Sequence, residues 1–370
     1  MRQLRPATIV LLLCLFALAL LPLFAEKYYI QLFTKMMIMA IFAMSLDLLV
    51  GFTGLVSLGH AAFFGLAGYV LAFAAPQYEA ANLWISLPLA MACSGLLALV
   101  IGSLVLRTSG IYFIMVTLAF AQMVFFVFHD TEFGGGADGI YVYSKPVAAI
   151  AGWEPFTLEN HTHFYFVVLV LLALAYAALR MLLASLFGRV IVGIRVNEQR
   201  MRSLGYRTFR YKLVCFVLSG ALAGMAGYFA AAQFGFVNPE TLGWHQSGSV
   251  LMMVILGGMG TLTGAIVGAF SMMLLELGLQ GLPDVGGMNL AKHWQLFMGG
   301  FIVLAVLLLP HGLLGMPRLV SRWLRKPAEA GGMSREQGPR KAGMRPSAIA
   351  VDRRQRPRLN GDDRAEAGDG

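Results

Sequence analysis

Charged residues are scarce in this sequence. Only 13% of its 370 residues are Asp, Glu, Lys or Arg, against about 25% in soluble globular domains. Hydrophobic residues make up 58%, and long apolar runs recur along the first 310 residues. A run of about 20 apolar residues spans a bilayer as a helix. The scarcity of charge therefore excludes a soluble domain of this size and predicts an all-α polytopic membrane protein.

Cysteine is also rare, and the common catalytic signatures are missing. Cys14, Cys93 and Cys215 all fall inside apolar runs, at spacings that suit neither a disulfide framework nor a metal site. The sequence contains no G-x-x-x-x-G-K-[ST] loop, no H-E-x-x-H and no G-x-S-x-G. We therefore expect no catalytic residues, no metal site and no cofactor bound by this chain, ATP included.

Apolar runs with few charges mark the candidate membrane spans. Because lipid offers the backbone no hydrogen-bond partners, each span must be helical or be shielded by helices. We expect a bundle of about ten transmembrane helices, some of them broken, at 8–25, 33–50, 56–75, 84–106, 110–129, 164–184, 211–233, 248–258, 262–279 and 291–310. The first run is interpreted as an uncleaved span rather than a signal peptide. Whether 248–279 crosses once or twice is open, and two crossings satisfy the charge pattern.

The net charge of +9 is unevenly distributed along the chain. Segment 185–212 holds seven basic residues and one acid, whereas 130–163 holds five acids and one base. Positive charge marks cytoplasmic segments, so 185–212 and both termini are expected inside the cell and 130–163 outside. This pattern does not indicate nucleic-acid binding. The basic tail 316–370 follows the membrane domain 1–315, and its composition predicts disorder. A dispensable solvated tail is the favoured interpretation, with contact to anionic lipid as the alternative.

The apolar segment 45–69 carries polar residues that a lipid-facing helix does not need. Gly51 and Gly54 flank a predicted break between helices, and broken helices expose backbone groups that transporters use to hold polar substrates. Ionisable groups within the membrane face the bundle interior or water. Structural hydrogen bonding and substrate contact both explain such residues, and this choice is open. The candidate substrate pathway comprises Asp47, Thr53, Ser57 and His60.

Glycines recur at intervals of four residues in two later segments. This spacing places them on one face of a helix, where they let two backbones approach closely. It predicts tight helix packing at Gly220, Gly224, Gly260, Gly264 and Gly268.

The basic segment 185–212 has the local signals of a small folded unit. Asn197 can cap a short helix over 198–204, and Gly205 can end that helix in a left-handed conformation. A partner protein that pushes on the chain requires such a folded unit. The alternative interpretation is that 185–212 is only a basic linker at the membrane surface. The candidate contact residues are Glu198, Arg200, Ser203, Leu204, Gly205 and Tyr206.

Three quoted stretches resemble the permease subunits of branched-chain amino acid ABC importers. "SLDLLVGFTGLVSLGHAAFFGLAGY" resembles the N-terminal signature of that family, and "NEQRMRSLGYRTFRYKLVCFVLSGALAGMAG" is similar to its cytoplasmic coupling loop and the following helix. "NPETLGWHQSGSVLMMVILGGMGTLTGAIVGA" is similar to its third signature. The motif "FGGGADGI", in the segment 130–163 that is expected outside the cell, favours the second of the two permease paralogues. The resemblance covers roughly 35–310.

The resemblance implies a subunit that translocates branched-chain or similar hydrophobic amino acids across the bacterial inner membrane. It implies a dimer with the other permease paralogue, two cytoplasmic ATPases that use ATP and Mg, and a periplasmic amino-acid-binding protein. Glu198, Leu204 and Gly205 match the loop that meets the ATPase. Urea and short-amide importers share the first signature and stay an alternative. A free-standing secondary transporter is less favoured, because such carriers more often show several ionisable groups inside their spans.

Overall fold

The described part of the chain is mainly helical. The computed structural model describes residues 17–23, 25–75, 80–149, 157–281, 294–308 and 312–313. Most of the predicted first span 8–25, the ends of the predicted span 291–310 and the whole predicted tail 316–370 lie outside these described residues.

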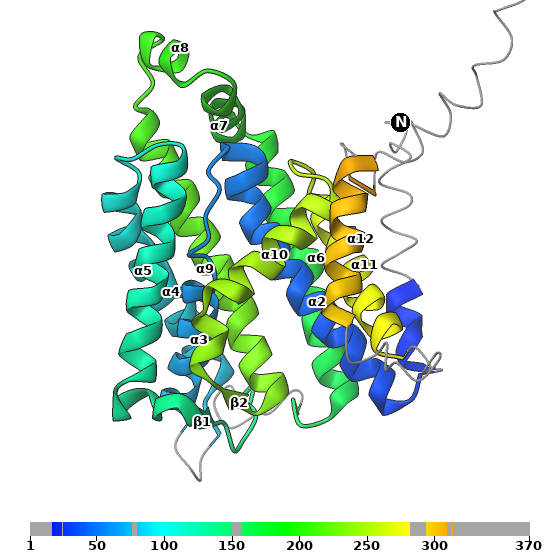
Figure 1. The fold of residues 1–370 in the computed structure, drawn as a ribbon. Helices are drawn as coiled ribbons and strands as arrows, with labels where there is room; N and C mark the ends of the chain where they lie inside the picture. The colour runs from blue at the N-terminus through cyan, green and yellow to red at the C-terminus, as the bar shows by residue number, and fades with distance from the viewer. Residues whose placement is uncertain are drawn as a thin grey trace, which may run out of the picture. The chain divides into compact units, whose positions relative to one another are not determined.

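Eleven α-helices of six or more residues give the described part of the chain its architecture (Figure 1). They are α2 (Lys27–Asp47), α3 (Ala61–Ala74), α4 (Leu83–Val105), α5 (Ile111–His129), α6 (His161–Ala184), α7 (Leu186–Val196), α8 (Glu198–Ser203), α9 (Thr208–Phe234), α10 (Trp244–Gly257), α11 (Leu262–Gln280) and α12 (Trp294–Leu308). Two short antiparallel strands, β1 (Ile140–Tyr141) and β2 (Phe236–Val237), pair at the end of the bundle opposite α7 and α8.

Six helices in the described part are long and apolar enough to cross a membrane. They are α2 with the turn that follows it, α4, α5, α6, α9 and α11, whereas α3 and α12 are apolar but shorter. Helix α10 has 14 residues, which at 1.5 Å per residue reach about 21 Å of a hydrocarbon core of about 30 Å. The polytopic helical fold is confirmed, and the count of ten crossings stays a prediction.

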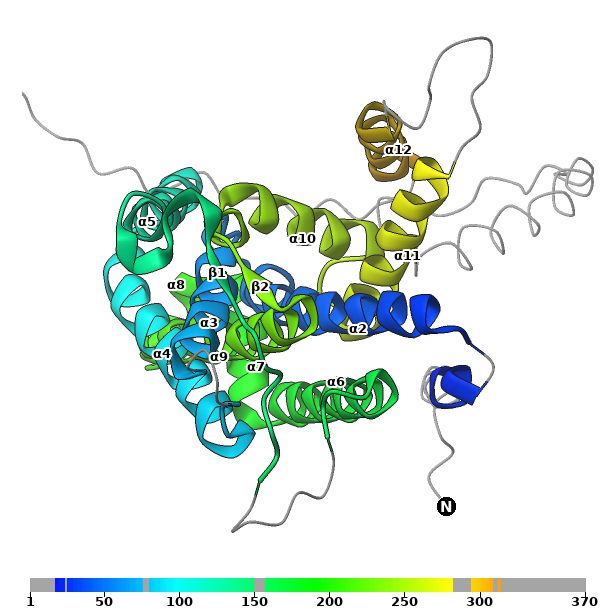
Figure 2. The same cartoon turned by 90° about the horizontal axis from the view of Figure 1, so that it is seen from below.

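Helix α2 forms the centre of the bundle. Every residue from Met36 to Val50 is buried, which suits a sequence that is apolar on all its faces. Figure 2 shows α2 with α6 on one side and α10 and α11 on the other. The polar groups on α2 are therefore surrounded by protein rather than by lipid.

Small residues let three helices pack closely in the other half of the bundle. A Cβ atom added at Gly224 would overlap the side chain of Ser94 on α4, and one at Gly227 would overlap the backbone of Phe64 on α3. Gly220 meets Ala98 of α4 in the same way. The predicted packing role of the glycines in α9 therefore has a direct structural counterpart.

The second glycine series splits between a helix and a turn. Gly264 and Gly268 lie on α11 and face the backbone of α10, where a Cβ would overlap it. Gly260 lies outside the helix, in the turn between α10 and α11, with φ of 82°. A positive φ is accessible to glycine at little cost, so Gly260 is fixed by the turn rather than by a helix face.

Candidate functional site

The central helix breaks where it approaches α7. Helix α2 continues into a π-helical turn, η2 (Leu48–Thr53), which ends at Gly54 with φ of 77°. The Thr53 hydroxyl donates a hydrogen bond of 2.9 Å to the carbonyl oxygen of Leu48 and closes the widened turn. Irregular backbone follows until α3 begins at Ala61. Such backbone is tolerated at membrane depth only where protein or a water-filled cavity surrounds it.

Asp47 joins the end of α2 to the turn between α10 and α11. Its Oδ1 atom accepts a hydrogen bond of 2.8 Å from the backbone N–H of Gly260. Its Oδ2 atom is buried and has no hydrogen-bond partner among the described residues. Gly51 lies against the same contact, because a Cβ at this position would overlap both Asp47 and the backbone of Gly260. The carboxylate is thus a structural link between two segments distant in sequence.

Arg195 of α7 reaches the same place from outside the bundle. Its guanidinium donates a hydrogen bond to the carbonyl oxygen of Gly51, a group that the break of α2 leaves for an outside partner. Its positive charge attracts Asp47. A Cβ at Gly54 would lie 3.2 Å from the Arg195 stem, and one at Gly260 would lie 3.1 Å from Nη1. We call the set Asp47, Gly51, Arg195 and Gly260 the arginine joint.

His60 links three helices in a packed, apolar setting. Its Nε2 atom lies 2.9 Å from the Ser45 hydroxyl of α2 and 3.3 Å from the Ser219 hydroxyl of α9. Its ring stacks on Phe42, with the ring centroids 5.6 Å apart. Its Nδ1 atom is buried without a hydrogen-bond partner in the described part of the chain. Ser57 nearby accepts a hydrogen bond of 3.2 Å from the backbone N–H of Gly59.

The four predicted pathway residues are all buried, with exposed fractions of 3% or less for Asp47, Thr53, Ser57 and His60. Each makes at least one hydrogen bond within the protein, and none of them lines the cavity described next. These positions agree with the structural interpretation of the residues. Contact with substrate stays a prediction for all four.

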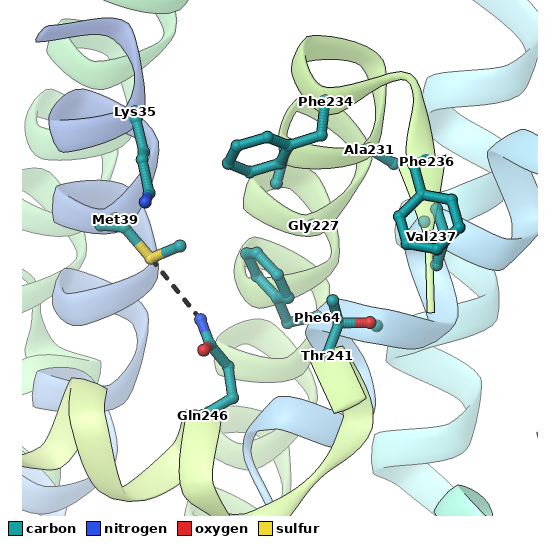
Figure 3. Close-up of a pocket in the computed structure, with 13 residues that line it drawn as sticks. Lys35, Met39, Phe64, Gly227, Ala231, Phe234, Phe236, Val237, Thr241 and Gln246 are labelled. Atoms are coloured by element: carbon teal, nitrogen blue, oxygen red, sulfur yellow. Dashed lines mark hydrogen bonds between the residues drawn. The ribbon is translucent and has the colours of Figure 1, made fainter. Parts of the chain in front are cut away.

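A cavity of about 200 Å³ lies toward the end of the bundle that carries β1 and β2 (Figure 3). Helices α2, α3, α9 and α10 form its walls, together with β2 and the 3₁₀ turn η5 (Pro239–Leu242). The residues that line it are Lys35, Met39, Phe64, Gly65, Gly68, Gly227, Ala230, Ala231, Phe234, Phe236, Val237, Thr241 and Gln246.

The sequence reasoning missed this cavity and its one cationic residue among those described, Lys35. A signal was present, because Lys35 interrupts an apolar run that a spanning helix would keep free of charge. The other lining residues carried no such signal, since they come from four helices, a strand and a turn that only the fold brings together.

The basic segment forms the small folded unit that its sequence predicts. The Asn197 side chain accepts a hydrogen bond of 2.9 Å from the backbone N–H of Arg200 and caps α8. Helix α8 covers Glu198–Ser203, one residue less than expected, and Gly205 follows with φ of 87°. Helix α7, which precedes α8, was not predicted.

Glu198 is the centre of the polar contacts in this unit. Its Oε1 atom accepts hydrogen bonds from Arg202 at 2.7 Å and from the Thr208 hydroxyl at 3.0 Å, and its Oε2 atom pairs with Lys212. Burial raises the pKa of the Glu198 carboxyl, but the hydrogen bonds from Lys212, Arg202 and Thr208 outweigh burial and hold the pKa below its ordinary value. The charged form of Glu198 therefore fastens α8 to the start of α9.

The outer surface of this unit is both apolar and basic. Leu204 is 66% exposed and Tyr206 is 40% exposed, and Arg200 and Ser203 are exposed beside them. Figure 1 shows α8 beyond the ends of the spanning helices. The predicted contact residues are thus together on one projecting unit, apart from Glu198, which is partly buried behind them.

Comparison with known proteins gives a consistent answer. A family model described as "Branched-chain amino acid transport system / permease component" matches residues 28–308. The high-affinity branched-chain amino acid transport system permease protein LivM of Salmonella typhimurium is 32% identical over 316 residues, which cover 80% of this chain and 72% of LivM. LivM of Escherichia coli K12 gives the same identity and the same coverage.

A weaker similarity extends to another import system. The autoinducer 2 import system permease protein LsrC of Photorhabdus luminescens is 32% identical over 149 residues, which cover 39% of this chain and 42% of LsrC. No solved structure matches the chain. Because the family model covers far more than half of the chain and LivM aligns over most of both proteins, the chain belongs to the family of permease components of branched-chain amino acid transport systems.

Proposed function

We propose that this chain is the permease subunit of an ATP-driven importer and passes branched-chain or similar hydrophobic amino acids across the bacterial inner membrane. Family membership and the similarity to LivM support the transport role and the substrate class. The partners in this proposal are a second permease paralogue, two cytoplasmic ATPase subunits that bind ATP and Mg, and a periplasmic amino-acid-binding protein. The chain itself holds no catalytic group in this proposal.

The observation that carries the proposal is the connection from α8 to the broken end of α2. Helix α8 is fastened to α9 through Glu198, and α7, directly before α8, reaches the Gly51 carbonyl through Arg195. The exposed Leu204 and Tyr206 offer an ATPase an apolar contact, and the surrounding arginines suit an acidic rim on that partner.

The mechanism follows from this connection. An ATPase biases the permease only if it binds one conformation better than the other. Closure of the ATPases would move α8, and α7 would carry the movement through the arginine joint to the break in α2 and to the turn between α10 and α11. The side of the membrane to which the pathway opens would then follow the state of the nucleotide.

Reconstitution into liposomes tests the proposal. The complete complex, with binding protein outside and ATP within reach of the ATPases, is expected to take up labelled leucine. The purified chain alone is expected to move none, with or without ATP. Uptake by the chain alone under a proton or sodium gradient would contradict the proposal and favour a secondary transporter. A complex that imports urea or a short amide, but no hydrophobic amino acid, would support the alternative substrate class.

The role of α8 is tested with a matched pair of glycine variants. A Cβ at Gly205 or at Gly278 of α11 meets no atom within 4 Å, but only Gly205 has a positive φ. Gly205→Val therefore strains the end of α8 by about 1 kcal/mol or more, whereas Gly278→Val does not. We expect Gly205→Val to abolish uptake and substrate-stimulated ATP hydrolysis at normal abundance, and Gly278→Val to retain both. Normal uptake by Gly205→Val would mean that the ATPase docks elsewhere.

A further inference from the structure

Lys35 places a positive charge inside the bundle with no acidic partner among the described residues. It is the ninth residue of α2, about 12 Å along the axis from the first residue, at 1.5 Å per residue. Its side chain is half-buried, and no described carboxylate lies within ion-pair distance of it. Its Nζ atom lies 5.7 Å from the centre of the Phe234 ring. An ionisable residue at membrane depth marks a functional site unless its charge is satisfied within the protein.

The cavity around Lys35 combines this cation with apolar walls. Phe64, Phe236 and Val237 supply large apolar surfaces, and no carboxylate is among the described residues that line it. Figure 3 shows Lys35 and Gln246 on one side of the space, facing Phe64 and Phe234. A ligand with a carboxylate and an apolar side chain fits this distribution, whereas a ligand whose only charge is positive does not.

Two further polar groups at the cavity are available to a ligand. The Gln246 amide donates its hydrogen bond to the sulfur of Met39 at 3.7 Å, and a thioether is a weak acceptor. A carboxylate would therefore be a better partner for this amide. The Thr241 hydroxyl donates to the Asn238 carbonyl at 2.7 Å and keeps its lone pairs free to accept from an ammonium group.

The size of the cavity limits what it can hold. At about 200 Å³ it lies below the range of roughly 300–1,000 Å³ that is usual for drug-sized ligands. A small molecule fits this volume, whereas a lipid with its acyl chains does not. Its place near β1 and β2 puts it toward the outer face in the orientation predicted from charge.

We propose that this cavity is a binding site for the amino acid in transit, with the substrate carboxylate on Lys35 Nζ and the aliphatic side chain against Phe64. Gln246 adds a second donor to the carboxylate, and the Phe234 ring faces the substrate ammonium. This inference rests on the proposed function, and it assigns the recognition of the substrate head group to a residue outside the segment 45–69.

The test uses the complete complex in phosphatidylcholine liposomes and a diazirine analogue of leucine with a free carboxylate. Irradiation is expected to label peptides that contain Phe64. Excess leucine should prevent labelling, and leucinamide, which lacks the carboxylate, should not. Lys35→Met should lower labelling and leucine uptake roughly 10- to 100-fold, because a hydrogen bond to a charged group is lost. Lys35→Arg should retain most of both.

Two control variants separate recognition from structure. Lys27→Met removes another lysine of α2 that lies outside the cavity, and should change neither labelling nor uptake. Glu276 lines a neighbouring hollow together with Lys35, beyond ion-pair distance. If Lys35 serves only to balance Glu276, Glu276→Gln will reproduce the effect of Lys35→Met, and the proposal fails. We expect Glu276→Gln to leave the preference for leucine over leucinamide unchanged.

Other results of the labelling and uptake experiments would overturn the proposed binding site. Labelling and uptake by Lys35→Met at the level of the unmodified chain would overturn the site, as would equal competition by leucine and leucinamide. If phosphatidylglycerol in the liposomes prevents labelling and leucine does not, the occupant is a lipid head group and the proposal fails. Uptake of leucine by a complex labelled elsewhere would overturn the site but leave the proposed function standing, whereas no uptake of any branched-chain amino acid would overturn both.

Discussion

Helix α2 carries two charged side chains within its apolar length, and their surroundings in the fold differ. Asp47 is fully buried, receives a hydrogen bond from Gly260 and lies within the electrostatic reach of Arg195. Lys35 is half-buried, lines a cavity and makes no ion pair with the described residues. The two residues are twelve positions apart on one helix.

The difference separates a structural charge from one that is available to a ligand. The partners of Asp47 are supplied by the protein and fix the relation of α2 to α7, α10 and α11. The cation of Lys35 lacks such a partner in the described structure, so substitution there should affect binding more than folding. An ionisable residue within a span is therefore best interpreted from its partners, and sequence shows only that it is there.

The largest expected effect is on folding, at the Asp47 end of α2. Gly51→Ala adds a Cβ that overlaps Asp47 and the backbone of Gly260, neither of which can move freely. We expect a loss of about 1–3 kcal/mol in the free energy of unfolding, and a lower yield of monodisperse protein. Gly248→Ala on α10 is the matched control, because its Cβ meets nothing within 4 Å. Equal thermal stability of the two variants would show that the joint is loosely packed.

A second prediction compares how substitution of each charged residue of α2 changes stability. Asp47→Leu removes the acceptor of the Gly260 N–H and leaves that partly buried group unpaired, at a cost of about 1–3 kcal/mol. Lys35→Met removes no hydrogen bond within the described protein and should change stability by about 0.5 kcal/mol or less. Thermal unfolding in detergent measures both. A larger loss of stability from Lys35→Met than from Asp47→Leu would contradict the assignment of Asp47 as the structural charge of α2.

Arg195 should affect coupling more than stability. Arg195→Met removes the donor to the Gly51 carbonyl from a partly exposed side chain. We expect ATP hydrolysis by the complex to continue while leucine uptake falls about tenfold or more, because a hydrogen bond from a charged donor is lost. The ratio of leucine imported to ATP hydrolysed is the measurement. Arg189→Met, on the same helix but outside the joint, should leave the ratio unchanged.

The smallest expected effect concerns pH and the attachment of α8. The pKa of Glu198 in the folded chain is held below its ordinary value, which is about 4.3 in an unfolded chain. Its contribution to stability is therefore complete above that ordinary value, and is lost as pH falls through the lower folded pKa. Hydrogen exchange in α8, corrected for the intrinsic pH dependence, should speed up in this acidic range. Glu198→Gln should already exchange faster at neutral pH and show no such step.

Local features of this protein could be predicted from its sequence, and contacts between distant segments could not. Asn197 and Gly205 predicted the cap and the end of α8, because both effects act within a few residues. The break after Gly51 was predictable from the glycines and the polar residues around it. The partner of Asp47 lies 213 residues away, and sequence spacing carries no information about such a pairing.

The same limit explains the residues that the sequence placed wrongly or missed. The i, i+4 spacing of Gly260 with Gly264 suggested one helix face, but the turn that Gly260 forms takes precedence over helix propensity. The significance of Lys35 depends on its having no acidic partner among the described residues, which only the fold can show. Arg195 looked like one of seven basic residues, and only its reach to Gly51 distinguishes it.

The contact between Asp47 and Gly260 also has a consequence for biosynthesis. At about 5–20 residues per second, a ribosome makes the partner of Asp47 roughly 10–40 s after Asp47 itself. Until then the carboxylate lacks the Gly260 N–H, and holding an ionisable group within a span costs up to about 2.5–3.5 kcal/mol, the value for the bilayer centre. Helix α2 is thus inserted early but reaches its final environment late.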